Sequence, residues 1–226
     1  MNTKYSVQKI KIADLTISLQ VFAHPEQEFD RHFTEVDTSV PEPPLYGCLW
    51  PSAEGLAHYL VPFGSALKGC RVLEIGCGLA LPSLALASLG AIVTAMDHHP
   101  GVMELLAFNA QLNGLAPLRT VIGSFADSTL MLGSFDLIIG SDILYEPQTY
   151  PDLEAFILRH AGPHARIVVA DPGRYAVEKF GTPLKARGEF QIIPQLVPGQ
   201  ERPIEIRVFS LKERETTLRQ RQDKIG

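Results

Sequence analysis

The stretch from Arg71 to Leu89, RVLEIGCGLALPSLALASL, constrains the fold more than any other part of the sequence. It predicts a buried strand over residues 72–75, a glycine-rich turn, and a helix entered at Pro82. In open α/β sheets, a strand, turn and helix of this kind hold a nucleotide-like ligand at the carboxyl end of the strand. Gly76 and Gly78 would let the backbone approach that ligand without an intervening Cβ atom.

The bulk properties of the chain limit its fold class and its partners. Its 226 residues suffice for one domain with a sizeable core, and a hydrophobic content of 46% is ordinary for a globular protein. The net charge of −5 argues against a broad nucleic-acid-binding face. Residues 1–12 lack a signal-peptide core, and no apolar run is long enough to span a membrane. We therefore expect a cytoplasmic protein without nucleic-acid or membrane partners, and a monomer because no heptad repeat or long apolar tail is present.

The cysteines and the paired histidines do not indicate a metal site. Cys48, Cys70 and Cys77 lack CxxC spacing, so neither a disulfide framework nor a zinc site is expected. His98 and His99 are adjacent, and no carboxylate cluster with ligand spacing follows them. We expect the backbone of His98 to lie beside the bound ligand and His99 to lie on the surface.

The pattern of apolar residues places the elements around this stretch. Alternation from Tyr5 to Phe22 predicts a β-hairpin, and the polar, proline-rich text from His24 to Pro44 predicts a long loop. A helix entered at Pro51 would present one apolar face, made of Leu56, Tyr59, Leu60 and Phe63. Further buried strands are expected at 91–96, 119–122, 135–140 and 167–170, and further helices at 100–113, 147–161 and 175–186.

The alternation of strands and helices determines the predicted architecture. It demands a parallel sheet with right-handed crossovers. The last two strands, 190–193 and 204–211, have no helix between them and should pair antiparallel. We predict an α/β, Rossmann-like fold with a doubly wound, seven-stranded, mostly parallel sheet, an antiparallel last strand and an N-terminal β-hairpin. One domain should cover residues 1–226, with a hairpin and loop extension (1–45), a core (46–211) and a charged tail (212–226).

The glycine loop departs from two phosphate-binding motifs. A dinucleotide fold would require glycine at position 81, where the chain has Leu81, and the Gly-Lys-Ser/Thr of the Walker loop is absent. The chain has E-x-G-x-G instead, with Glu74 at the end of the first strand. Asp97 follows the next strand, 19 residues beyond Gly78, where an acid hydrogen-bonds ribose hydroxyls. Two carboxylates without a cationic phosphate clamp favour a ribose-bearing, phosphate-free, positively charged ligand, and S-adenosylmethionine has these properties.

Several separated motifs carry a resemblance to a known family. From Gly47 to Leu211 the chain resembles the class I, seven-β-strand, S-adenosylmethionine-dependent methyltransferases. Within them it is similar to the protein-lysine methyltransferase group with a D-x-x-Y motif, which includes the calmodulin-, chaperone- and electron-transfer-flavoprotein-lysine enzymes. The matching segments are GCLWPSA at 47–53, LEIGCG at 73–78 with Leu81-Pro82, Ser124-Phe125, and SDILYE at 141–146.

The resemblance adds site residues to those found from the chemistry of the loop. It implies that Asp142 and Tyr145 are catalytic. The cofactor-binding set then consists of Trp50, Glu74, Gly76, Gly78, Asp97, His98, Phe125 and Ser141. The chain departs from the family at two places: Leu79-Ala80 replaces the usual third glycine or threonine-glycine, and Phe125 stands where tryptophan is usual, which keeps a stacking face but removes the indole donor.

The expected reaction is methyl transfer from S-adenosylmethionine to a lysine side-chain amine of a protein. Asp142 would bind the incoming ammonium, and Tyr145 would fix the amine or the methionine end of the cofactor. A small-molecule N-methyltransferase acting on a nicotinamide-like or free amine remains an alternative, and a non-catalytic interaction protein on the same fold is a third. Asp142 could instead only cap the next helix, and the segment 171–174 either shapes the substrate mouth or forms a plain turn.

Overall fold

A computed structural model describes residues 4–34 and 44–212, without the side chains of residues 31–34. Seven strands form one sheet in the order β5-β4-β3-β6-β7-β9-β8. The first five run parallel, and β9 is antiparallel to both of its neighbours. The predicted fold class is therefore confirmed. The strands are β3 (Arg71–Ile75), β4 (Ile92–Asp97), β5 (Arg119–Ile122), β6 (Phe135–Ser141), β7 (Ala161–Asp171), β8 (Gly188–Gln195) and β9 (Ile204–Leu211).

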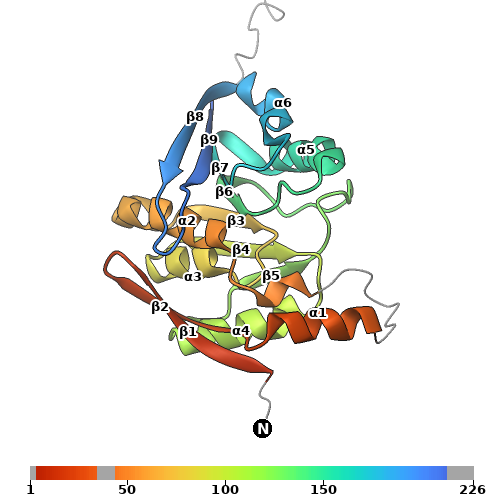
Figure 1. The fold of residues 1–226 in the computed structure, drawn as a ribbon. Helices are drawn as coiled ribbons and strands as arrows, with labels where there is room; N and C mark the ends of the chain where they lie inside the picture. The colour runs from red at the N-terminus through yellow and green to blue at the C-terminus, as the bar shows by residue number, and fades with distance from the viewer. Residues whose placement is uncertain (1–3, 35–43, 213–226) are drawn as a thin grey trace, which may run out of the picture.

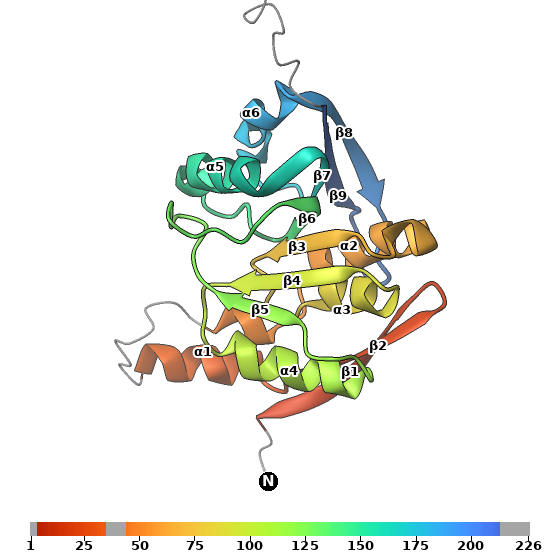
Figure 2. The same cartoon turned by 180° about the vertical axis from the view of Figure 1, so that it is seen from behind.

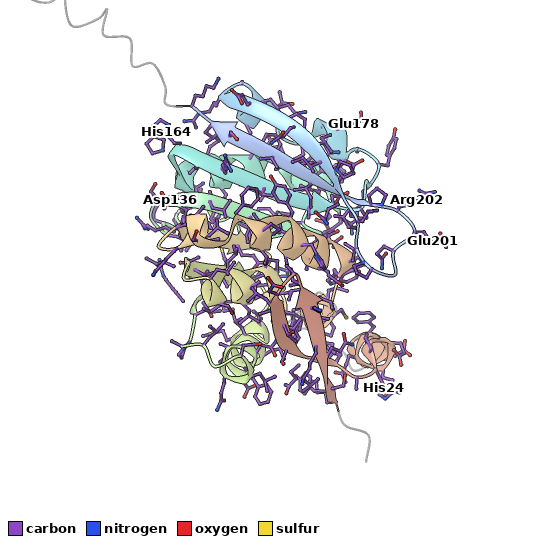
Figure 3. The ribbon with its side chains drawn as sticks, turned by 90° about the vertical axis from the view of Figure 1, so that its left-hand side faces the viewer. His24, Asp136, His164, Glu178, Glu201 and Arg202 are labelled. Carbon is purple, nitrogen blue, oxygen red and sulfur yellow. The ribbon has the colours of Figure 1, made fainter. Side chains whose placement is uncertain are left out.

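Helices cover both faces of this sheet (Figure 1). On one face, α2 (Pro51–Leu60) packs against β6, β7, β8 and β9, and α3 (Leu81–Ser88) packs against β3 and β4. Figure 3 shows α2 and α3 lying across this face. The apolar cluster under α3 continues into α4 (Val102–Leu112). On the other face, α5 (Tyr150–His160) and α6 (Thr182–Lys185) bury an apolar cluster that includes Phe156, Phe180 and Phe209.

The chain changes direction across the sheet between β3 and β6. From β3 it proceeds through β4 to the edge strand β5, and it then returns to add β6 on the other side of β3 (Figure 2). The helix after β3 and the helix after β6 cover opposite faces, so the two loops diverge at the carboxyl ends of neighbouring strands. In open α/β sheets a ligand crevice forms at such a point.

The predicted N-terminal hairpin is present, and two asparagines hold it to the core. Strands β1 (Tyr5–Ile12) and β2 (Leu15–Phe22) pair antiparallel. Asn113 Oδ1 accepts from the backbone N–H of Ser18 at 2.8 Å, and its Nδ2 donates to the Ser18 carbonyl at 2.8 Å. Asn113 directly follows α4, and Asn109, fully buried within α4, accepts from the N–H of Gln20 at 2.7 Å. The two amides therefore satisfy the edge of β2 as a neighbouring strand would.

The predicted loop over residues 24–44 was wrong in its first part. A helix, α1 (Pro25–Thr34), occupies it. Pro25 suits the first helical position, and Glu26 and Glu28 lie in the first turn, where the helix dipole favours carboxylates. Proline and charge were interpreted as loop signals, although here they start a helix. The rest of that loop, at 35–43, and the tail beyond residue 212 lie outside the described residues.

Other predicted helices differ at their ends or are interrupted. The helix expected at 175–186 is two short pieces, η4 (Val177–Lys179) and α6, because Ala176 and Gly181 adopt left-handed backbone conformations. The helix entered at Pro51 stops at Leu60, so Phe63 lies in the 3-10 helix η2 (Val61–Leu67) and is exposed. The helix expected at 147–161 begins as the 3-10 helix η3 (Pro147–Thr149) and continues as α5.

Glu74, in β3, hydrogen-bonds to the first turn of α3 and so stabilises the turn between the two elements. Its side chain is completely buried, and Oε2 accepts from the backbone N–H of Ser83, in the first turn of α3, at 3.1 Å. Burial raises the pKa of Glu74 to about 8, although the hydrogen bonding with Ser83 acts in the opposite direction. The carboxyl group is therefore largely protonated at neutral pH, and it caps the amino end of the helix.

Replacing Asn109 with alanine should destabilise the protein by about 1 to 3 kcal/mol, because the N–H of Gln20 loses its acceptor. The loss is expected even though alanine is the better helix former. Urea unfolding measures the change, and Gln111→Ala, on the exposed side of the same helix, is the matched control. Equal stability of the two variants would show that the amide does not hold the hairpin.

Glu74 should make stability depend on pH. Because its pKa is higher in the folded chain than the ordinary 4.5, the folded state binds the proton more tightly. The free energy of unfolding should therefore fall as the pH rises from about 5 to about 8 and level off above that range. Glu74→Gln mimics the protonated form, so its stability relative to the wild type should increase across this range in urea titrations. A difference that stays constant with pH would contradict the raised pKa.

Candidate active site

A cavity of about 350 Å³ lies at the carboxyl ends of β3, β4 and β6. This is the crevice expected where the chain changes direction, and its size suits a small cofactor. Nine of the ten predicted site residues line it: Trp50, Gly76, Gly78, Asp97, His98, Phe125, Ser141, Asp142 and Tyr145. Glu74 is the exception, since its carboxyl lies beneath α3. The structure thus gathers nine of these residues around one cavity and places the Glu74 carboxyl outside its lining.

The glycine loop forms the floor of the cavity. Gly76 and Gly78 both have positive φ, at 63° and 48°, a conformation that side chains other than glycine rarely adopt. A Cβ atom on Gly76 would lie 2.7 Å from Cγ2 of Ile143, and one on Gly78 would lie 3.3 Å from the carbonyl oxygen of Tyr46. Both positions therefore need glycine for conformation and for space.

Asp97 joins the glycine loop to the end of β4. Its Oδ2 accepts from the N–H of Gly78 at 2.9 Å, and its Oδ1 accepts from the N–H of His99 at 3.0 Å. Each carboxylate oxygen keeps a second lone pair. Asp97 is therefore held in place by two hydrogen bonds, and it could still accept hydrogen bonds from the hydroxyl groups of a ligand in the cavity.

Aromatic rings also line the cavity, and one of them, Tyr46, was not among the site residues predicted from the sequence. Trp50, at the start of α2, donates from Nε1 to the carbonyl of Leu45 at 3.2 Å. Tyr46 packs its ring against that of His99, with centroids 4.2 Å apart, so His99 is part of the wall and not the surface residue that we predicted. Burial raises the pKa of Tyr46 to about 12. Tyr46 directly precedes the GCLWPSA segment, but no pattern distinguished it from a core tyrosine.

Asp142 has an unusual backbone conformation at the opposite end of the cavity. Its φ of 57° lies in the left-handed region, which non-glycine residues seldom occupy, and its N–H donates to the carbonyl of Ala170 at 3.0 Å. Such strain is concentrated at functional sites. Asp142 caps no helix, because the next 3-10 helix begins only at Pro147 and has no side-chain cap.

An arginine that the sequence analysis left undecided binds Asp142. Arg174 donates from Nη2 to Asp142 Oδ1 at 2.5 Å and from Nη1 to Asp171 Oδ2 at 2.7 Å. Burial opposes the charge on Arg174, but the hydrogen bonds to both carboxylates hold the pKa of the guanidinium above its ordinary value. The turn at 171–174 therefore belongs to the site, and only the folded chain brings it to Asp142.

The rim of the cavity opens to solvent near Asp142. Tyr145 is 52% exposed, and Glu146 beside it is also exposed. Both residues line the cavity. A side chain of another molecule can therefore reach the Asp142 end from outside.

Two kinds of site have no counterpart among the placed residues. Within 4–34 and 44–212, no three His, Cys, Asp or Glu side chains gather where they could hold a metal ion. No helix in the same part of the chain is long and apolar enough to cross a membrane.

The chain is similar in sequence to proteins that are named as methyltransferases. The human histone-arginine methyltransferase METTL23 is 33% identical over 126 residues, which are 53% of this chain and 66% of that protein. The electron transfer flavoprotein beta subunit lysine methyltransferase of Danio rerio is 32% identical over 155 residues, 66% of this chain and 58% of that protein. The chain thus spans between about half and two thirds of the length of these relatives.

Solved structures agree with the fold. The magnesium protoporphyrin IX methyltransferase of Synechocystis PCC 6803, solved with S-adenosylmethionine bound, has a TM-score of 0.58 to this chain. It is 17% identical, and the likeness covers 85% of this chain and 99% of that one. Similarity at this identity supports the fold alone.

A match to a protein-family model shows which family the chain belongs to. The model described as lysine methyltransferase matches residues 44–180, which is more than half of the chain and includes the glycine loop, Asp97, Asp142 and Arg174. The chain belongs to the lysine methyltransferase family.

Proposed function

We propose that this protein is an S-adenosylmethionine-dependent methyltransferase that modifies a lysine side-chain amine of a protein. The observation that carries the proposal is the presence of two different ends in one cavity. One end, after β3 and β4, is rigid and carries the glycine loop and Asp97, and the other end, after β6, carries Asp142 and opens to solvent at Tyr145. The family match and the relatives named for protein methylation support the same reading.

The residues at the rigid end fit the cofactor. Asp97 has lone pairs left for ribose hydroxyls, and the left-handed glycines let the cofactor lie against backbone. Trp50 and Phe125 offer aromatic faces, and His98 and Ser141 complete the wall. Glu74 acts indirectly in this proposal, by fixing α3 and the loop that precedes it.

Positioning is the main task at the other end of the cavity. When bound, S-adenosylmethionine supplies a methyl group on a sulfonium, and the C–S bond breaks with its electron pair left on sulfur as the new N–C bond forms. The lysine ammonium binds as a cation and must then lose a proton to solvent before transfer, since its ordinary pKa is about 10.4. Asp142 attracts and orients the ammonium, and Tyr145 restricts its approach to one line.

A protein acceptor fits the open rim better than an enclosed small molecule does. The exposed Tyr145 and Glu146 leave space for a polypeptide that carries the target side chain. A small amine remains the alternative, because a free amine would make the same contact with Asp142. We also expect a monomer in the cytoplasm, where the three free cysteines would stay reduced.

Cofactor binding should be visible through Trp50, the only tryptophan of the chain. Adding S-adenosylmethionine should change its fluorescence saturably, with a micromolar midpoint that calorimetry confirms. Asp97→Asn should weaken this binding about tenfold or more, because its amide N–H₂ would face a backbone N–H. Asp14→Asn, in the hairpin turn, is the control. Failure of the wild type to bind would remove the cofactor from the proposal.

Asp142→Asn should keep cofactor affinity within about twofold but reduce methyl transfer at least about a hundredfold. Asparagine tolerates the left-handed backbone at this position and removes only the charge. The assay supplies labelled S-adenosylmethionine to a cell extract and separates protein from small molecules, again with Asp14→Asn as the control. Wild-type activity in Asp142→Asn would contradict the role of Asp142.

The same assay separates the three candidate functions. Label in protein, released on hydrolysis as methyl-lysine, supports the proposal. Label confined to small molecules supports the small-amine alternative. Cofactor binding without any transfer supports a non-catalytic protein on this fold.

A further inference from the structure

The carboxylate of Asp142 is largely covered and already paired in this structure. Oδ1 is hydrogen-bonded to Arg174 at 2.5 Å. Oδ2 is buried from solvent and has no hydrogen-bond partner among the residues that the structure describes. The side chain as a whole is only 12% exposed, although the residue lines the cavity. A cation that pairs with this carboxylate must therefore compete with Arg174.

Arg174 is the group that can move. The backbone of Asp142 is fixed by the hydrogen bond from its N–H to the carbonyl of Ala170. Arg174 is 31% exposed, lines the same cavity and has a long flexible side chain. A rotation of that side chain would uncover Asp142 without disturbing the sheet.

Asp171 provides a second anchor for Arg174 after such a rotation. Asp171 is completely buried, and its Oδ1 accepts from the N–H groups of Gly173 and Arg174, each at 2.8 Å. Its Oδ2 accepts from Arg174 Nη1. One guanidinium is thus shared between two carboxylates, which leaves one net negative charge in the group.

We propose that Arg174 is a latch on Asp142 that a cationic acceptor displaces, so that Arg174 selects charged over neutral acceptors. This inference rests on the proposed function. After displacement, Asp142 pairs with the acceptor cation and Arg174 pairs with Asp171, so each carboxylate has its own counter-ion. A neutral acceptor, such as a pyridine nitrogen, cannot replace a charge-assisted hydrogen bond to a buried carboxylate without leaving that carboxylate uncompensated.

The latch predicts the sign of a mutational effect. Arg174→Gln removes the competitor, so methyl-lysine formation in a dialysed protein extract at limiting acceptor should be faster than in the wild type, by about tenfold. A residue that only positioned Asp142 would give a slower enzyme. The ammonium of Arg174→Lys cannot bridge two carboxylates as a planar guanidinium does. The rate of this variant should therefore lie between those of the wild type and Arg174→Gln. Arg166→Gln, at an exposed position of β7, is the matched control and should behave as the wild type.

Two further measurements keep this test separate from that of the proposed function. The Trp50 fluorescence titration should give the same cofactor affinity for Arg174→Gln and the wild type. Nicotinamide, a neutral acceptor, should receive no label from the wild type.

The outcomes distinguish the two proposals. An Arg174→Gln rate equal to or below that of the wild type overturns the latch, and so does methylation of nicotinamide by the wild type. A wild type that binds no cofactor, or that binds it and transfers nothing to protein, refutes the proposed function instead.

Discussion

The divergence of two loops at neighbouring parallel strands is the constraint on which the site depends. β3 and β6 are joined along their length, from Val72 opposite Leu137 to Ile75 opposite Gly140, so the strands cannot separate. The helices that follow them, α3 and α5, nevertheless lie on opposite faces of the sheet. The loops that leave the two strands must therefore diverge. Ile143 packs into this parting, where a Cβ atom on Gly76 or Gly140 would lie within 2.7 Å of its side chain. The connectivity therefore creates the cavity, and the two glycines leave room for Ile143 beside it.

Two carboxyl groups then stabilise the glycine loop from different sides. Asp97 accepts from the loop at Gly78, and Glu74 accepts from the first turn of α3 just beyond it. Left-handed glycines are costly to order, so these bonds offset the flexibility of the loop. Asp97 faces the cavity and Glu74 is buried behind it, and for this reason the same type of residue has two different tasks.

Local signals in the sequence predicted most of the sheet and most of the cavity wall. The glycine loop, Asp97 and Asp142 each directly follow an apolar strand, so strand order alone gathers them at one edge. Arg174 could not be assigned in this way, because its meaning depends on a contact with Asp142 across 32 residues of sequence. Tyr46 and His99 were also missed, since ring packing between separate segments leaves no periodic pattern. Gly181 was visible in the sequence as a possible break in the helix expected at 175–186, but that its backbone is left-handed is known only from the structure.

The two ends of the cavity differ in what could change between related proteins. The proposed cofactor end is built largely from backbone, through left-handed glycines and N–H groups bonded to Asp97, and a substitution there alters the loop itself. The proposed acceptor end is built from side chains, of which Arg174 is partly exposed and Tyr145 is half exposed. Such side chains can be replaced without disturbing the sheet. If the proposed function holds, a family of this kind can keep one methyl donor while its acceptors diverge, and the few residues around Asp142 should decide the acceptor of this chain.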